Sequence, residues 1–247
     1  MAGHSKWANI QHHKKAQDAK RGKLFTKLIR EITVAAREGG DPDANARLRS
    51  AVDKALSANM PKDTIERATK RGAGELDGEA YMEVRYEGYG PGGAAVLIDC
   101  MTDNRNRTVS EIRHIFSKFN GNLGTSGSVA YLFSAAGVIR FPAGVDQDQV
   151  MEIALESGAE DVVDTEDGGL EVITQVEGFL GTKQALEDSA LMPDHAEVTM
   201  RASSDVVLSD HDGEVMLRLL DALDALDDVQ NVYSNADIPE ALFEALA

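Results

Sequence analysis

The apolar residues of the first 75 positions recur at helical spacing. Between residues 16 and 37 they follow the i, i+4, i+7 or i+8 pattern of one helix face, which predicts a first helix. Gly39-Gly40 ends this helix, and Asp41-Pro42 begins a second, because an N-cap followed by proline is a helix start signal. Pro61 opens a third helix, so this segment is expected to be all helical. The apolar face of the first helix consists of Leu24, Phe25, Leu28, Ile29, Ile32, Ala35 and Ala36.

From Met82 onwards the apolar positions alternate, which is the pattern of a half-buried strand. After a linker at residues 73–80, the chain is expected to run strand, strand, helix, strand at residues 83–89, 94–101, 105–119 and 128–133. Residues 137–202 predict a strand, a helix, a hairpin, a helix and a strand, at 138–141, 148–157, 161–164 with 170–175, 182–190 and 196–201. That order is the split βαβ, or ferredoxin-like, order.

The tail adds a short strand, a helix and a strand at residues 206–208, 213–226 and 229–233. Neither this tail nor residues 82–133 makes a full sheet alone, so we expect the two to join. The predicted fold is α+β, with an N-terminal all-helical domain followed by two α/β-sandwich (ferredoxin-like) domains, the last inserted in the middle one. The expected boundaries are 1–78 for the helical domain, 79–133 plus 205–247 for the middle domain, and 134–204 for the inserted domain.

Charge divides along the same boundaries. Residues 1–75 hold 16 Lys and Arg against 9 Asp and Glu, a net charge of +7, although the whole chain carries −17. Residues 134–204 hold 3 against 15, and residues 205–247 hold 1 against 11. A basic first third on an acidic body predicts a polyanionic partner for that third. For the acidic part, solubility and contact with basic proteins both remain open.

The first helix carries a stripe of cations at spacings of 3, 4, 3 and 7 residues, opposite its apolar face. Like charges at this spacing destabilise a helix, so the stripe favours nucleic-acid binding over helix stability. The alternative is a solvated charged face. The stripe consists of Lys20, Lys23, Lys27, Arg30 and Arg37, and Arg21 lies beside it.

Ahead of the stripe, an N-terminal arm combines cations, histidines and the only tryptophan. Trp and His can stack on bases and Lys can pair with phosphates, although an arm whose tryptophan packs in the helical core explains the same residues. A metal site is not expected here, because adjacent histidines do not share a helix face. The candidate binding residues of the arm are Lys6, Trp7, His12, Lys14 and Lys15.

A second candidate anion site lies where the strand at 94–101 leads into the next helix. Arg105 and Arg107 are placed at the start of that helix, where the dipole disfavours cations but the free N–H groups attract an anion. Two arginines beside such a terminus could clamp a phosphate. The alternative is a side-chain N-cap with two solvent-facing arginines.

Several classes of protein are not supported by the sequence. The glycine-rich stretch 88–93 precedes a strand and has no following Lys-Ser or Lys-Thr, which excludes a P-loop and a Rossmann fingerprint. No nucleophile–base motif or metal signature is present, so we expect no catalytic residues, no metal, no cofactor and no small-molecule substrate. No apolar run is long enough for a membrane span, no secretory signal begins the chain and Cys100 is the only cysteine, so we expect a cytoplasmic protein.

Several long motifs give the chain a family resemblance. Residues 3–10 (GHSKWANI), 16–23 (AQDAKRGK), 25–31 (FTKLIRE) and 86–93 (YEGYGPGG) closely resemble the YebC family, as do residues 102–108 and 121–133. The resemblance is dense over residues 3–141 and looser over the acidic remainder.

The resemblance implies a three-domain α+β protein with no enzymatic activity that regulates gene expression. Bacterial members of this family resemble ribosome-associated translation factors that relieve elongation stalls, and mitochondrial relatives resemble translational activators. We therefore expect a nucleic-acid-binding regulator that contacts ribosomal RNA and the ribosome. A DNA-binding transcriptional regulator is the alternative, and a metal-dependent hydrolase is a remote one. The stripe indicates only that phosphates are bound, and DNA and RNA both carry phosphates. The sequence therefore does not decide between a DNA and an RNA target, and it does not give the target sequence, the direction of regulation or the oligomeric state.

Overall fold

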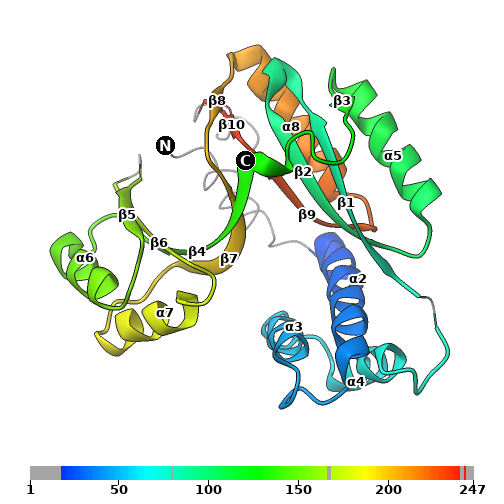
Figure 1. Cartoon of the computed structure of the whole chain (residues 1–247), viewed down its shortest axis with the longest axis horizontal. Helices are drawn as coiled ribbons and strands as arrows, with labels where there is room; N and C mark the ends of the chain where they lie inside the picture. Colours follow the sequence, from blue (N-terminus) through cyan, green and yellow to red (C-terminus); the bar gives the residue numbers. More distant parts are fainter. Residues whose placement is uncertain (1–17, 79, 166–167, 240–241, 243–247) are drawn as a thin grey trace. The chain divides into compact units, whose positions relative to one another are not determined.

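The described part of the helical domain consists of three helices and a short 3-10 turn. The computed structural model describes residues 18–78, 80–165, 168–239 and 242, with only the backbone described at residues 18–21. The helices are α2 (Asp18–Ala35), continued by η1 (Ala36–Glu38), then α3 (Ala46–Ser57) and α4 (Lys62–Gly72) (Figure 1). Their apolar faces meet in a core that includes Leu28, Ile32, Leu48 and Ile65.

The second helix begins later than the sequence predicts. Asp41-Pro42 does not open α3; this pair lies in a turn, and the N-cap is Asn45. The Asn45 side chain accepts a hydrogen bond from the Leu48 N–H at 3.0 Å and donates to the Ala35 carbonyl at 2.8 Å. The cap therefore also fastens α3 to the end of α2, a tertiary role that local sequence rules do not register.

In its described residues the middle domain has a four-stranded antiparallel sheet with the helices α5 (Arg105–Lys118) and α8 (Asp210–Asp224) on one face. Its strands are β1 (Met82–Tyr89), β2 (Ala95–Thr102), β3 (Asn122–Leu123) and β9 (Val229–Ser234), in the order β3-β1-β2-β9. The helices α5 and α8 pack on it through Ile98, Phe116, Met216 and other buried residues. The tail therefore joins residues 82–123 in one sheet, as the sequence predicts, through β9 alone.

The short tail strand β8 (Val206–Val207) does not enter that sheet. It pairs in parallel with β10 (Ala236–Asp237) as a separate two-stranded ladder. The Val206 N–H also donates to the Asn235 carbonyl at 2.8 Å, which holds the beginning and the end of the tail together.

The predicted strand at 128–133 is wrong for all but its last residue. Residues 130–132 form a 3-10 turn, η3 (Ala130–Leu132), and β4 runs from Phe133 to Phe141. The buried carboxylate of Glu87 accepts hydrogen bonds from the N–H groups of Gly127, Val129 and Ala130, each at 2.7 Å. Because the carboxylate uses these donors, they are not available to a strand ladder.

The inserted domain has the ferredoxin-like order. Its elements after β4 are α6 (Gln147–Glu156), β5 (Asp161–Asp164), β6 (Leu170–Thr174), α7 (Phe179–Asp188) and β7 (His195–Ala202). The sheet order is β5-β6-β4-β7 with every pair antiparallel, and the core includes Phe141, Val172 and Leu186. The α+β class, the N-terminal helices and the two antiparallel domains are confirmed.

Described residues 131–205 form one compact unit, and described residues 18–130 with 206–242 form another.

Candidate nucleic-acid interface

Three cations of the predicted stripe meet one short segment of the middle domain. Lys23 donates to the Ala225 carbonyl at 2.9 Å, and Lys27 donates to the Asp224 carbonyl at 3.1 Å. Lys27 also forms an ion pair with the Asp224 carboxylate at 2.7 Å. Arg30, the next stripe residue along α2, donates to the Asp227 carbonyl. We call this set of contacts, between Lys23, Lys27 and Arg30 of α2 and residues 224–228, the α2–α8 contact.

The physical basis of this contact is the end of α8. The last carbonyl groups of a helix have no partner inside it and carry the negative end of the dipole, so cations are favoured there. Lys23 and Lys27 supply those cations to Asp224 and Ala225 from another helix. Lys23, Lys27 and Arg30, at i, i+4 and i+7, thus face residues 224–228 of the same protein. The spacing of the stripe therefore fits a partner within the chain as well as an external ligand.

Arg30 lies deepest in the contact. Its guanidinium forms an ion pair with Asp228, Nη1 to Oδ1 at 2.9 Å, and both side chains are buried, with 10% and 3% of their surfaces exposed. It also donates to the Met101 carbonyl at 3.3 Å and lies over the Tyr81 ring, 5.2 Å from its centroid. Arg30 is therefore not accessible to a phosphate in this arrangement, and its assignment as a binding residue stays a prediction.

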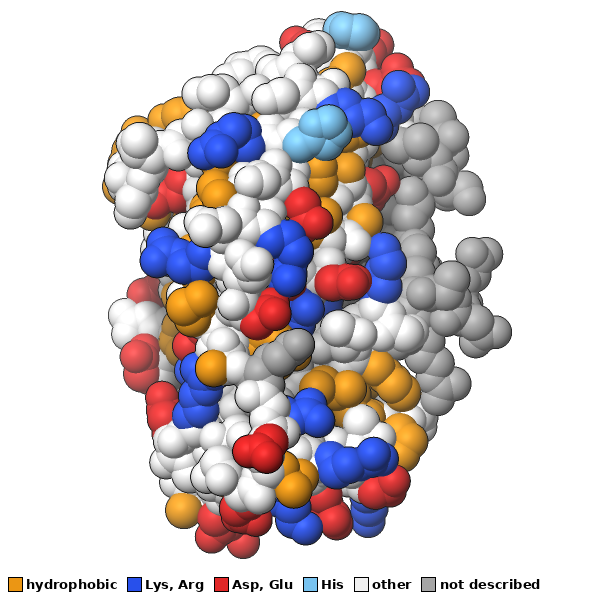
Figure 2. Space-filling model, turned by 90° about the vertical axis from the view of Figure 1, so that its right-hand side faces the viewer, with side chains coloured by type: hydrophobic (Ala, Val, Ile, Leu, Met, Phe, Trp, Pro, Cys, Tyr) orange, Lys and Arg blue, Asp and Glu red, His pale blue; other side chains and the backbone are white. Residues whose placement is uncertain are grey.

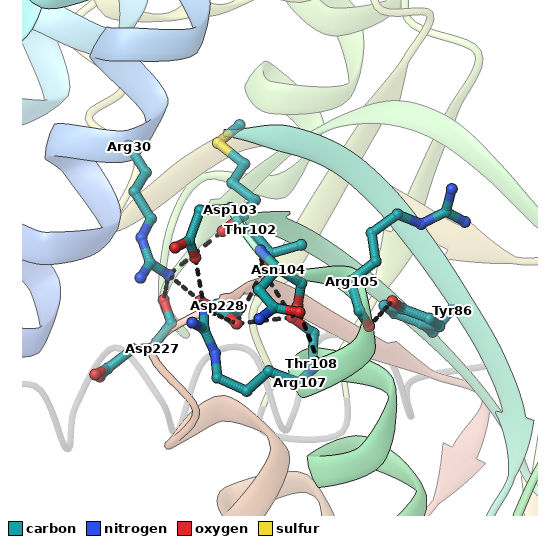
Figure 3. A network of polar contacts seen from close by, with 11 residues as sticks. Arg30, Tyr86, Thr102, Asp103, Asn104, Arg105, Arg107, Thr108, Asp227 and Asp228 are labelled. Atoms are coloured by element: carbon teal, nitrogen blue, oxygen red, sulfur yellow. Dashed lines mark hydrogen bonds and ion pairs between the residues drawn. The ribbon is translucent and has the colours of Figure 1, made fainter. Parts of the chain in front are cut away.

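Asp228 also binds a second arginine, Arg107 (Figure 3). Arg107 of α5 donates to both of its carboxylate oxygens, at 2.9 and 2.8 Å, and to Asp103 at 2.7 Å. The hydroxyls of Thr108 and Thr102 donate to Asp228 as well, at 2.7 and 3.1 Å. One buried carboxylate thus ties α2, β2, α5 and the start of β9 together.

The titration of this network follows from the contacts. Burial by itself would raise the pKa of Asp228, but the hydrogen bonds from Arg107 and Thr108, together with nearby positive charge, outweigh it and lower that pKa. The hydrogen bond from Arg107 likewise lowers the pKa of Asp103, and the two carboxylates raise the pKa of Arg107. Asp228, Asp103 and Arg107 are therefore all charged at neutral pH.

The structure separates the two arginines that the sequence pairs. The N-cap of α5 is Asn104, whose side chain accepts from the Arg107 N–H at 3.1 Å, so part of the alternative interpretation is correct. Arg107 turns into the network, whereas Arg105 is exposed and points away from it (Figure 3). The unfavourable dipole that motivated the anion site is offset at Arg107 by carboxylates of the protein, so Arg105 is the better candidate for an external anion.

Much of the predicted interface lies outside the described residues. Lys6, Trp7, His12, Lys14 and Lys15 fall there, and so do the side chains of Lys20 and Arg21. Lys23 is exposed despite its hydrogen bond, and Lys27 is mostly covered.

Exposed cations are spread over the surface, with acidic side chains among them. Figure 2 shows Lys and Arg side chains interleaved with Asp and Glu on one face. Exposed basic residues of the helical domain and α5 include Arg37, Lys62, Lys70, Arg105, Arg113 and Lys118. On this face the cations are therefore separate and do not form a continuous basic surface.

Asp224 and Asp228, the acidic partners of the stripe, are not among the functional residues that the sequence predicts. A usable signal does exist: Asp221 and Asp224 lie in the last turn of a predicted helix, where negative charge is unfavourable unless a cation is near. Such a placement predicts a basic partner for the end of α8, although it does not identify α2.

The chemistry of the described residues is that of ion pairing and hydrogen bonding. In the part of the chain that the structure describes, no three His, Cys, Asp or Glu side chains are grouped so as to hold a metal ion. None of the described helices combines the length and the apolar character needed to cross a membrane.

Comparison with known proteins gives matches over almost the whole chain. Residues 5–75 match the family model described as the TACO1/YebC protein N-terminal domain, and residues 81–236 match the TACO1/YebC second and third domain. A "Probable transcriptional regulatory protein" of Methylococcus capsulatus is 66% identical over 247 residues, all of both chains. Another protein so named, from Coxiella burnetii, is 64% identical over 97% of this chain and 99% of its own length. The crystal structure of a conserved hypothetical protein from Aquifex aeolicus has a TM-score of 0.78 and 49% identity, covering 90% of this chain and 93% of that one.

Proposed function

The chain belongs to the TACO1/YebC family, and we propose that it is a nucleic-acid-binding regulator of gene expression that acts as a translation factor on ribosomal RNA. The relatives' names support the regulatory role. The observation that carries nucleic-acid binding is the net charge of +7 on residues 1–75 of a chain that carries −17 overall. Cations that are concentrated on one domain of a protein repelled as a whole by polyanions favour a polyanionic partner for that domain.

The arrangement of the cations favours RNA over DNA as the target. They run along one helix and its N-terminal arm, which suits contact with phosphates and unstacked bases better than base reading by a helix-turn-helix. Exposed Lys23 and Arg105 are the described residues best placed to add phosphate contacts. The cytoplasm, where ribosomes are found, is the compartment that fits this proposal.

DNA-binding transcriptional regulation is the second candidate, and the names of the relatives favour it. The test is to crosslink the full-length protein in cells and to sequence the bound RNA and DNA. Crosslinks concentrated on ribosomal RNA would support the translation factor, and crosslinks concentrated at promoters would support the alternative. Recovery of neither nucleic acid above the level of a charge-matched acidic control protein would contradict both.

Binding in solution provides the physical check. The purified chain should bind an RNA duplex, with an affinity that falls linearly in a double logarithmic plot against salt concentration. Lys23→Glu should weaken binding, whereas Glu75→Gln, which removes an exposed acidic group at the edge of the same domain, should not weaken it. Turnover of an RNA or DNA substrate that disappears with a chelator would instead point to a metal-dependent hydrolase.

A further inference from the structure

The segment that meets the α2 stripe is itself a row of negative charges. Residues 221–228 contain four aspartates and no Lys or Arg. Two of them, Asp224 and Asp228, form ion pairs with Lys27 and Arg30. We propose that residues 221–228 are an internal competitor for nucleic acid, which occupies the stripe until a polyanion displaces it and separates α2 from the end of α8. This inference rests on the proposed function and adds a regulatory contact to it.

The stripe cannot contact residues 221–228 and a polyanion at the same time, because its cations are largely covered. The Lys27 side chain has 16% of its surface exposed and Arg30 has 10%. A phosphate that pairs directly with either cation must take the position now held by Asp224 or Asp228. A polyanion that engages the whole stripe therefore cannot bind while the α2–α8 contact is closed.

The composition of the contact allows it to open. A small buried apolar cluster of Val34, Tyr81 and Met101 accompanies its polar groups, and Arg30 contacts two of these residues, the Tyr81 ring and the Met101 carbonyl. The Lys27–Asp224 pair, whose side chains have 16% and 34% of their surfaces exposed, weakens with salt and can exchange for a contact with another anion. The buried Arg30–Asp228 pair is screened less, so the contact opens fully only when a polyanion replaces the counter-charge of Arg30. The connection from α4 to β1 contains Gly74, whose φ is +80°, and has no helix or strand over residues 73–78, so the chain between the two domains has irregular backbone that can change direction.

The first test removes one competing charge. Asp224→Asn keeps the carbonyl that Lys27 uses but abolishes the ion pair, so the open form should become more populated. Affinity for an RNA duplex should rise by about 1.5- to 5-fold, the range that one partly exposed ion pair contributes. Asp210→Asn is the matched control, because it makes the same charge change at the other end of α8 on an exposed residue. If the two substitutions change the RNA affinity equally, the proposal that residues 221–228 compete with nucleic acid is wrong.

The second test measures the opening directly. Spin labels on Ser57→Cys in α3 and Ser110→Cys in α5 report the distance between the helical and middle domains, and both serines are exposed. Cys100 is buried and burial raises its pKa to about 12, so it does not take up label. Saturating RNA duplex, and in a parallel sample inorganic polyphosphate, should shift the distance distribution, and Asp224→Asn should shift it part of the way without ligand.

The outcomes separate this inference from the proposed function. Binding of RNA with an unchanged label distance would leave the proposed function intact and refute the competitor. A shift with polyphosphate but no affinity for RNA or DNA would support the competitor and refute the proposed function. Failure of RNA, DNA and polyphosphate alike to bind would refute both.

Discussion

Arg30 and Asp228 form a buried ion pair at 2.9 Å although they come from opposite ends of the chain. The arginine belongs to the helical domain and the aspartate precedes the last strand of the middle-domain sheet. The same carboxylate also receives Arg107 from α5. Removing one partner of such a buried ion pair leaves the other charge buried without a counter-charge, and this destabilises the fold strongly.

Asp228→Asn should therefore lower the free energy of unfolding substantially. The substitution leaves Arg30 buried without a counter-charge, and losing one partner of a buried pair costs about 3–5 kcal/mol. Urea denaturation followed by circular dichroism measures the change. Asp210→Asn, on an exposed residue, should stay within about 0.5 kcal/mol of the wild type. A small effect of Asp228→Asn would mean that the network relaxes or hydrates easily.

Arg105→Ala and Arg107→Ala should have opposite consequences. Arg105 is exposed and turned away from Asp228, so its removal should leave the melting temperature unchanged, lower RNA affinity and reduce the salt slope by about one unit. Arg107→Ala removes two ion pairs, to Asp103 and Asp228, and should lower the melting temperature. Salt-titrated binding and thermal melts of the two variants decide this. If the two variants behave alike in both measurements, the division of roles between these arginines is wrong.

Local patterns sufficed for most of the fold. The apolar face of α2 and the alternation in β1 are properties of neighbouring residues, and they predict these elements directly. The ferredoxin-like order of the inserted domain follows from such elements in sequence, because few topologies join them in that order. The errors arose where a distant side chain replaced local bonding. Glu87 accepts from the N–H groups of Gly127, Val129 and Ala130, and Asn45 caps α3 while it donates to the end of α2.

The candidate site was harder to predict for the same reason. Spacing placed Lys23, Lys27 and Arg30 on one stripe, and the structure keeps them on one side of α2. Spacing does not reveal what the stripe faces, because Asp224 and Asp228 lie in a distant part of the chain. A charged stripe opposite an apolar face has two possible partners, solvent with its ligands or another domain, and only the fold distinguishes them.

Cys100 should be unreactive in the native protein. It is buried in β2, and burial raises its pKa to about 12, so almost no thiolate is present at neutral pH. A thiol reagent should therefore modify Cys100 at about pH 8 only through unfolding, at a rate that rises with urea. Modification as fast as that of a free thiol, without urea, would show that β2 is accessible.

Glu87→Gln should release the segment before β4. In the native protein the Glu87 carboxylate accepts three backbone hydrogen bonds, from Gly127, Val129 and Ala130. A glutamine replaces one oxygen by an amide group that donates, so at least one of these N–H groups loses its acceptor. The expected loss of stability is about 1–3 kcal/mol, the usual cost of an unsatisfied buried polar group.

The pH dependence identifies the charge of Glu87 as the cause. Burial alone would raise the pKa of Glu87, but the three backbone hydrogen bonds outweigh it and lower that pKa. A lowered pKa gives stability that is complete above the unfolded value of about 4.3 and is lost as the pH falls through the folded value. The stability gap between the wild type and Glu87→Gln should therefore narrow on acidification from about pH 7 to about pH 3. Urea midpoints across this range test it, and hydrogen exchange should show faster exchange of the Val129 and Ala130 amides in Glu87→Gln. A gap that stays constant with pH would assign the effect to side-chain shape and not to charge.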